Sequence, residues 1–209
     1  MTQSGERLEA RAVVVATGAT PQRIDAPGER RLVGRGLSYS AVSHAQLFIE
    51  KDAALFGCGG RALRAAAELA RVAKRVHLLL PDQDEMRSPL GFKLRASPNL
   101  IVYRDVELCE IRGEQFVESV VVKSQGVTQE IAVDGLFIEL GLTPNSQPVA
   151  DLGVTESQGR IVIDCKCATS YPGLFAAGDV TDSFIEQVLI CVGEGAKAAL
   201  NAYDYLLSQ

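Results

Sequence analysis

The sequence predicts an α/β fold in which a parallel βαβ unit is followed by an antiparallel meander. Two observations predict it. Between residues 53 and 80, an apolar segment, a glycine-rich turn, a helical segment with small residues on one face and a second apolar segment follow one another. Beyond residue 100, the apolar segments become short and are separated by turn residues.

The composition is that of a globular chain. With 209 residues, 47% of them hydrophobic, the chain is long enough to bury one sizeable core or two small ones. A formal net charge of -5 without a long basic run argues against nucleic acid or an anionic membrane as partner. The apolar runs are far shorter than the roughly 20 residues of a membrane helix. The polar N-terminus lacks the apolar core of a secretory signal, so we expect a cytoplasmic protein.

The five cysteines do not suggest a disulfide framework, because their number is odd and they are scattered along the chain. Cys165 and Cys167 would share one face of a strand, but no second pair and no nearby histidine completes a metal site. We therefore expect reduced thiols and no metal.

Each element of the predicted fold has a local signal. Residues 12–16 form a continuous apolar run, which predicts a strand over residues 11–16 that is buried on both faces and runs into the Gly18 turn. The βαβ unit consists of a strand at 53–56, a helix at 61–72 and a strand at 76–80. Four short strands of the meander are predicted at 100–103, 117–123, 129–133 and 135–139. Two further strands at 160–163 and 174–176 precede a closing helix at 187–206.

The turn between the first strand of the unit and its helix carries the dinucleotide fingerprint Gly57-x-Gly59-x-x-Ala62. Gly57 permits the tight turn, Gly59 lets the backbone approach a pyrophosphate, and Ala62 keeps the helix close to the strand. The N–H groups of the helix start, with Arg61 beside them, would receive the phosphates. The motif therefore predicts a Rossmann-like dinucleotide-binding domain, although similar glycine turns also occur without a ligand.

An acidic segment at residues 81–85 follows the second strand of the unit. A carboxylate at Asp82 can accept hydrogen bonds from ribose hydroxyls, but it repels a 2′-phosphate. The expected nicotinamide cofactor is therefore NAD(H). A solvated acidic loop without a ligand is the alternative.

Four landmarks in order make the sequence resemble thioredoxin reductase, the low-molecular-weight type of pyridine nucleotide-disulfide oxidoreductase. They are residues 16–19, the Gly57 turn, residues 141–145 and residues 172–180. The resemblance implies that Gly178 and Asp179 approach FAD, that Gln187 lies beside the flavin ring, and that Gly141 belongs to the cofactor-binding set.

The resemblance also divides the chain into domains. Residues 1–33 and 145–209 correspond to pieces of an FAD domain, and residues 34–144 to an NAD(P)-binding-like domain. In the family, a further N-terminal segment, on the order of 100 residues, supplies most contacts to the ADP half of FAD. We therefore expect FAD only if another chain supplies the missing half.

The redox pair of the family is replaced. Ser40 and Ser43 stand in place of the two cysteines of a Cys-x-x-Cys-Asp segment, and His44 in place of its acidic residue. Serine cannot exchange disulfides, because that chemistry requires a thiolate, so no catalytic residue is expected there. A hydrolase based on Ser43 and His44 is disfavoured, because no G-x-S-x-G turn is present. Glu186 likewise stands where the family has a basic residue beside the flavin.

Three functions follow from these observations. The first is a degenerate thioredoxin-reductase-like protein, inactive at the disulfide site, that acts as a dinucleotide-binding or interaction module. The second is an FAD- and NAD(P)H-dependent oxidoreductase subunit completed by a flavin-domain partner chain, and the third is a ligand-free structural dimer. A homodimer is expected because the apolar segments 12–16, 174–177 and 187–206 would otherwise expose a large apolar surface.

Overall fold

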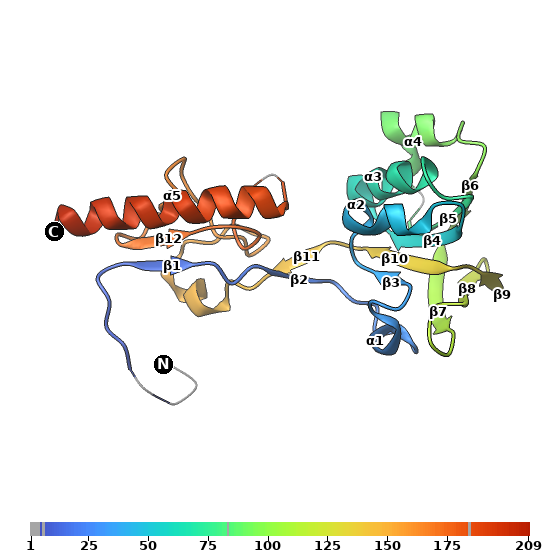
Figure 1. Cartoon of the computed structure of the whole chain (residues 1–209), viewed down its shortest axis with the longest axis horizontal. Coiled ribbons are helices and arrows are strands. Elements are labelled where there is room, and N and C mark those ends of the chain that lie inside the picture. Colours follow the sequence, from blue (N-terminus) through green and yellow to red (C-terminus); the bar gives the residue numbers. More distant parts are fainter. Residues whose placement is uncertain (1–4, 6, 83, 184) are drawn as a thin grey trace. The chain divides into compact units, whose positions relative to one another are not determined.

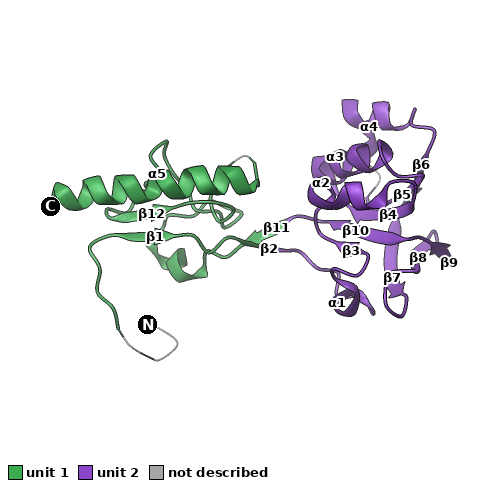
Figure 2. Cartoon of the chain, in the orientation of Figure 1, with its two compact units in different colours: residues 1–20, 142–209 green, residues 21–141 purple. Residues whose placement is uncertain are grey.

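The computed structural model describes residue 5 and residues 7–82, 84–183 and 185–209. The chain forms two compact units (Figures 1 and 2). Unit 1 consists of residues 1–20 and 142–209, and unit 2 of residues 21–141. Two short strands, β2 (Ala19–Pro21) and β11 (Leu142–Pro144), pair where the chain passes between the units.

Unit 2 is built on a five-stranded sheet with the order β3-β10-β4-β5-β6, in which each neighbouring pair is parallel. Helix α3 (Gly59–Ala70) connects β4 to β5, which confirms the predicted βαβ unit. The strands are β3 (Leu37–Ser38), β4 (Asp52–Gly57), β5 (Arg75–Leu80), β6 (Leu100–Arg104) and β10 (Gly135–Glu139).

Helices cover one face of this sheet. Ala62, Leu63, Ala66 and Leu69 of α3 are buried against it, and their small side chains allow a close approach of helix and strand. The remaining elements of this layer are α2 (Ala41–His44), η1 (Ala45–Phe48), η2 (Asp84–Arg87) and α4 (Pro89–Leu94).

A three-stranded antiparallel sheet packs on the other face, which confirms the meander. Its strands are β7 (Val106–Arg112), β8 (Ser119–Ser124) and β9 (Val127–Ala132). Leu32, from the short helix α1 (Glu29–Leu32), is fully buried in the same hydrophobic cluster as Ile111 and Leu136. This packing groups residues 21–33 with unit 2, although the domain division predicted from the resemblance places them with the FAD-domain pieces.

Two of the four strands predicted for the meander belong instead to the parallel sheet. β6 pairs with β5, and β10 lies between β3 and β4. β10 is buried along its whole length, as expected for a strand with neighbours on both edges and layers on both faces. The meander also contains β7, which was not predicted from the sequence.

Unit 1 contains a short parallel pair, β1 (Val13–Val15) with β12 (Leu174–Ala176), and the 20-residue helix α5 (Val188–Leu207). A 3-10 helix, η3 (Gln147–Leu152), precedes the loop that leads to β12. The strand predicted at 160–163 is reduced to isolated bridges of Ile161. The prediction that residues 11–16 are buried on both faces is also wrong, because Val13 and Val14 of β1 are 48% and 40% exposed.

Within the described ranges, no helix combines the length and apolar character that crossing a membrane requires. The same part of the chain contains no group of three or more His, Cys, Asp or Glu residues arranged to hold a metal ion.

Candidate functional site

The turn after β4 combines a closely packed glycine with two open ones. A methyl group on Gly57 would lie 2.5 Å from the carbonyl oxygen of Glu139, so the packing of β4 against β10 itself requires glycine there. Gly59 has a φ of 71°, and a methyl group on Gly59 or Gly60 would have no neighbouring atom within 4 Å. The backbone at Gly59 and Gly60 is therefore open to a ligand.

The start of α3 is suited to an anion. Cys58 occupies the N-cap position, and its side chain makes no capping hydrogen bond. The N–H groups of the first helical turn carry partial positive charge, which favours a phosphate at this position. The predicted residues Gly57, Gly59, Arg61 and Ala62 thus form a turn that fits a dinucleotide pyrophosphate.

A buried carboxylate lies beside this turn. Glu139, at the end of β10, accepts a hydrogen bond from Arg61 Nε at 2.8 Å and from the backbone N–H of Ala41 at 2.8 Å. The side chain of Glu139 is 4% exposed and that of Arg61 is 33% exposed. The pair neutralises the buried charge and ties the first turn of α3 to the start of α2.

Glu139 was not among the predicted site residues. An acidic residue at the end of an apolar strand, next to a glycine-rich turn, is the signal that could have indicated it. Arg61 is already bonded to this carboxylate, and its direct contact with a cofactor phosphate stays a prediction.

Asp82 follows β5 and is exposed. Because Phe56 pairs with Leu79 in the parallel register, the Gly57 turn and the segment after β5 lie at the same edge of the sheet. This is the arrangement that ribose recognition requires. Gln83 of the acidic segment lies outside the described residues. Gly141, with a φ of 124°, accepts a hydrogen bond from Gln22 N–H at 3.0 Å.

The two serines that replace the redox cysteines are hydrogen-bonded to each other. Ser40 is the N-cap of α2, its Oγ donates to Ser43 Oγ at 3.0 Å, and it accepts from the N–H of Ser43 at 3.3 Å. His44 Nδ1 lies 2.8 Å from Ser38 Oγ. The neighbouring residues Ser43 and His44 therefore do not form the hydrogen-bonded pair that a hydrolase would need.

In unit 1, the residues predicted to face FAD have partners within the unit. The N–H of Gly178 donates to Glu194 at 2.8 Å, and Glu194 also accepts from the hydroxyl of Ser183. The thiol of Cys191 donates to Asp179 at 3.3 Å. Burial and this carboxylate raise the pKa of the Cys191 thiol. Gln187 is the exposed N-cap residue of α5.

These contacts determine which hydrogen-bonding groups of Gly178 and Asp179 remain available to FAD. The N–H of Gly178 and the carboxylate of Asp179 already have hydrogen-bonding partners, and Cys191 Sγ would lie 3.3 Å from a methyl group on Gly178. The N–H of Gly178 is therefore committed to Glu194, whereas the carboxylate of Asp179 keeps acceptor capacity beyond this one bond. The contact of these residues with FAD stays a prediction.

The acidic residue at position 186 is explained by an ion pair within unit 1. Its carboxylate forms a 2.8 Å ion pair with Arg160, and both side chains are mostly buried. Arg160 also donates to the backbone oxygen of Thr181 at 3.2 Å. The acidic residue thus anchors the segment before α5.

Two of the segments that carry the resemblance are hydrogen-bonded to each other. Thr17 Oγ1 donates to the backbone oxygen of Asn145 at 2.6 Å, and Asn145 Nδ2 donates back to the backbone oxygen of Thr17 at 3.0 Å. The N–H of Asn145 donates to the carbonyl of Gly18 at 2.9 Å. These bonds hold Thr17 and Gly18 against Asn145 within unit 1.

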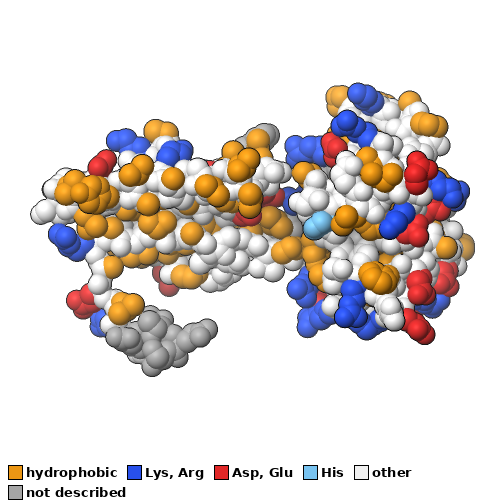
Figure 3. All heavy atoms as spheres, in the orientation of Figure 1, with side chains coloured by type: hydrophobic (Ala, Val, Ile, Leu, Met, Phe, Trp, Pro, Cys, Tyr) orange, Lys and Arg blue, Asp and Glu red, His pale blue; other side chains and the backbone are white. Residues whose placement is uncertain are grey.

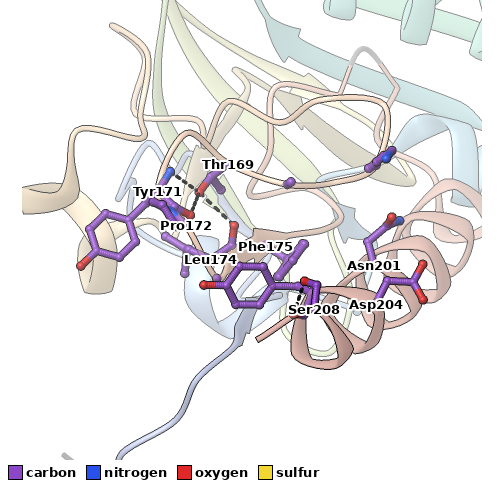
Figure 4. Close-up of a pocket in the computed structure, with 12 residues that line it drawn as sticks. Thr169, Tyr171, Pro172, Leu174, Phe175, Asn201, Asp204 and Ser208 are labelled. Carbon is purple, nitrogen blue, oxygen red and sulfur yellow. Dashed lines mark hydrogen bonds between the residues drawn. The ribbon is translucent and has the colours of Figure 1, made fainter.

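Unit 1 also contains a pocket of about 350 Å³ between the segment before β12 and the C-terminal half of α5 (Figure 4). The rings of Phe175 and Tyr205 contact each other edge to face, with centroids 6.2 Å apart. None of the predicted cofactor-binding residues lines this pocket. The candidate site is therefore the Gly57 turn of unit 2.

Comparison with known proteins identifies the family of the chain. The sequence pattern of the pyridine nucleotide-disulphide oxidoreductase family matches residues 1–195. The chain belongs to this family. The family consists of oxidoreductases with FAD- and NAD(P)-binding Rossmann folds, which confirms the resemblance and the fold class.

Individual relatives share about a third of the sequence. The F subunit of alkyl hydroperoxide reductase from Staphylococcus aureus is 35% identical over 208 residues, which cover 98% of this chain and 41% of that protein. Thioredoxin reductase from Streptococcus pyogenes has a TM-score of 0.86 at 33% identity, covering 95% of this chain and 66% of that one. Thioredoxin reductase from Giardia duodenalis has a TM-score of 0.83 at 29% identity, covering 94% and 66%. The chain thus spans less than half the length of the first relative.

Proposed function

We propose that the protein is a thioredoxin-reductase-like module that binds NAD(H) at the Gly57 turn and does not exchange disulfides. The single observation that carries the proposal is the open start of α3, where Gly59 and Gly60 have no neighbour that a methyl group would meet. An uncapped helix N-terminus of this kind favours a pyrophosphate.

The preference for NAD(H) over NADP(H) rests on Asp82. This carboxylate lies exposed after β5, at the sheet edge that carries the Gly57 turn. A doubly charged 2′-phosphate beside a carboxylate is repelled, whereas a ribose hydroxyl can donate to it. Calorimetric titration with both cofactors tests this preference, and tighter binding of NADPH than of NADH would contradict it.

A matched pair of glycine variants tests the site. Gly59→Val places a branched side chain where the pyrophosphate would lie, whereas Gly60→Ala adds one methyl group in open space at an ordinary helical position. We expect Gly59→Val to abolish NADH binding and Gly60→Ala to retain it. Because Gly59 has a positive φ, circular dichroism must show that its variant is folded. Equal binding by a folded Gly59→Val variant would reject the site.

The absence of disulfide exchange rests on Ser40 and Ser43. Thiol release from thioredoxin and a disulfide dye, with NADH or NADPH and added FAD, should not exceed the control without protein. Since the two Oγ atoms are 3.0 Å apart, Ser40→Cys together with Ser43→Cys should form a disulfide on mild oxidation. Ser40→Cys alone is the control and should keep a titratable thiol. Failure of the double variant to lose both thiols would reject the assignment of these positions.

An oxidoreductase subunit completed by a flavin-carrying chain is the second candidate. It is favoured by the relatives, which are named as thioredoxin reductases and as a subunit of alkyl hydroperoxide reductase. The absorption spectrum of the isolated protein separates the candidates. A flavin band would support the second, whereas a colourless protein that binds NADH would support the first. A colourless protein that binds neither cofactor would leave the ligand-free structural role.

A further inference from the structure

A serine and a histidine of unit 2 form a hydrogen-bonded pair that the proposed function does not use. Ser38 Oγ lies 2.8 Å from His44 Nδ1 and 3.3 Å from the carbonyl oxygen of Ser40, and it accepts from the N–H of Ser40 at 3.1 Å. The hydroxyl can therefore accept from Nδ1–H while it donates to this carbonyl. Because Ser38 Oγ is committed to these partners, it holds the imidazole ring and leaves Nε2 as the acid–base nitrogen.

The ring of His44 can be reached from solvent. The space-filling view shows histidine atoms at the surface of unit 2 (Figure 3), and of the two histidines of the chain His44 is exposed whereas His77 is only 5% exposed. The capping of α2 does not explain the pair, because the N-cap residue is Ser40, which accepts from the N–H of Ser43. An imidazole that is held through one nitrogen can exchange a proton with a bound molecule through the other.

The pair lies at the edge of the sheet that carries the Gly57 turn. The strands β3, β10, β4 and β5 are neighbours in this order and parallel, so their carboxyl ends meet at one edge. Ser38 ends β3, and Glu139 ends β10. Glu139 accepts from the N–H of Ala41 and from Arg61 at the start of α3. The segment that carries the Ser38–His44 pair is thus tied to the first turn of α3.

The strand order indicates which end of a dinucleotide the pair would meet. In the proposed function, on which this placement rests, the pyrophosphate lies at the Gly57 turn after β4 and the adenosine ribose at Asp82 after β5. A dinucleotide crosses the edge of the sheet, so its other half extends from β4 in the direction away from β5. The ends of β10 and β3 lie on that side. We therefore expect the nicotinamide near Ser38 and His44.

We propose that His44 is the acid–base residue of hydride transfer between NADH and a small uncharged carbonyl compound, and that Ser38 positions its imidazole. In the direction of reduction, the carbonyl carbon takes a hydride, that is two electrons and one proton, from NADH, which becomes NAD⁺. The carbonyl oxygen takes a second proton from Nε2 of protonated His44, so that an alcohol forms. The imidazole then regains its proton from solvent. In the oxidation of an alcohol, the same nitrogen accepts the proton.

The composition of the segment favours an uncharged substrate. Residues 38–44 contain three serines and one histidine but neither lysine nor arginine. A substrate carboxylate would need such a cation for a charge-assisted hydrogen bond. Val42, in the same segment, is 63% exposed and can pack against an apolar substituent. An aldehyde such as propionaldehyde should therefore be reduced faster than pyruvate, which carries a carboxylate.

The oxidation of NADH by propionaldehyde, followed by absorbance together with the amount of propanol formed, tests the reaction. His44→Gln should lower the rate by about 100-fold or more, because it removes the proton donor, while calorimetry shows unchanged binding of NADH. Ser38→Ala should also lower the rate, and Ser38→Thr, which keeps a hydroxyl, should restore it. Ser43→Ala is the matched control, since it changes the neighbour of His44 but not the pair, and it should keep the rate.

Modification of the histidines by diethyl pyrocarbonate gives a readout that does not depend on turnover. His44 should react fast and His77 slowly, because only His44 is exposed. The fast phase should be absent from His44→Gln. Saturating NADH should slow the modification of His44 in the intact chain, because the nicotinamide then covers the ring.

The outcomes separate this inference from the proposed function. Bound NADH that does not reduce propionaldehyde, or that leaves His44 unprotected, would overturn the inference and leave the proposed function intact. An unchanged rate in a folded His44→Gln variant would overturn the role of His44, and faster reduction of pyruvate than of propionaldehyde would overturn the substrate class. An intact chain that does not bind NADH would reject the proposed function and the inference together.

Discussion

The two units differ in how far their apolar surfaces are buried and in whether their glycine turns are open to a ligand. Unit 2 buries its five-stranded sheet on both faces, under helices on one side and the meander on the other, while the glycine turn at the sheet edge stays open. In unit 1, the pair β1–β12 and the helix α5 leave large apolar side chains exposed, while Gly178 and Asp179 already have internal partners. Unit 2 therefore buries its sheet and leaves a glycine turn open to a ligand, whereas unit 1 leaves apolar side chains exposed and bonds Gly178 and Asp179 internally.

This difference shows that two motifs of the same family need not keep equally accessible sites within one chain. The glycines at 57 and 178 match two landmarks of the same family, yet their surroundings differ. Next to Gly57, the contact with Glu139 sets the strand spacing and leaves Gly59 and Gly60 free for a ligand. At Gly178, by contrast, Glu194 of α5 accepts a hydrogen bond from the N–H, and Cys191 of α5 donates to the neighbouring carboxylate of Asp179.

Matched valine truncations should show the largest difference between the units. Val76 of β5 is fully buried, whereas Val13 of β1 is 48% exposed. We expect Val76→Ala to lower the free energy of unfolding by about 1.5–3 kcal/mol, because it removes buried methyl groups and leaves a cavity. Val13→Ala should lower it by less than about 1 kcal/mol. Urea unfolding followed by circular dichroism measures both, and equal losses would break the comparison.

The two buried glutamates sharpen the comparison with a smaller effect. Glu139 of unit 2 is paired with a cation, Arg61, whereas Glu194 of unit 1 accepts only from an N–H and a hydroxyl among its described hydrogen bonds. Glu139→Gln removes the negative charge beside Arg61 and should cost about 1–2 kcal/mol, since Arg61 is one-third exposed. Glu194→Gln keeps an acceptor for Gly178 and should cost at most about 1 kcal/mol. The same unfolding measurement, with a larger loss for Glu194→Gln, would reverse the comparison.

The smallest expected effect is on the loss of stability at acidic pH. Burial, followed by the charge of Arg75, lowers the pKa of His77 below its ordinary value, and Asp52 only partly opposes this shift. Because the folded state favours neutral His77, its contribution to stability is present above about pH 6.5 and is lost as the pH falls through the folded pKa.

His77→Gln should therefore make the decline of stability with acid less steep, as measured by urea unfolding from about pH 7 to pH 5. His44, the other histidine of the chain, is exposed, and His44→Gln serves as the control. An identical acid response of the His77→Gln variant and the intact chain would remove His77 from the account.

The local parts of the fold could be predicted from the sequence. The βαβ unit depends on the apolar runs of β4 and β5 and on the glycines between them, which are contiguous. The sheet to which β6 and β10 belong could not be predicted, because the partner of a strand depends on residues far away in the chain. β7 was missed because Glu107 and Glu110 interrupt its apolar residues with charges on the exposed side.

The residues of the candidate site likewise divide into those that could be predicted from the sequence and those that could not. The Gly57 turn follows from its motif, whereas the role of Glu139 depends on Ala41 and Arg61, which only the folded chain brings to it. The partners of Asp179 were likewise not predictable, since Cys191 reaches it from the first turn of α5. Buried polar side chains need partners, but the sequence does not name them.

Hydrogen–deuterium exchange of the full chain with and without saturating NADH tests most directly whether unit 2 is the binding module. Bound cofactor should slow exchange in the peptides that contain the Gly57 turn and the segment after β5, because it shields the amides at the start of α3. The peptides that contain Gly178 to Cys191 should not change. Protection in unit 1 alone, or no protection around Gly57 under conditions where NADH is bound, would contradict the account.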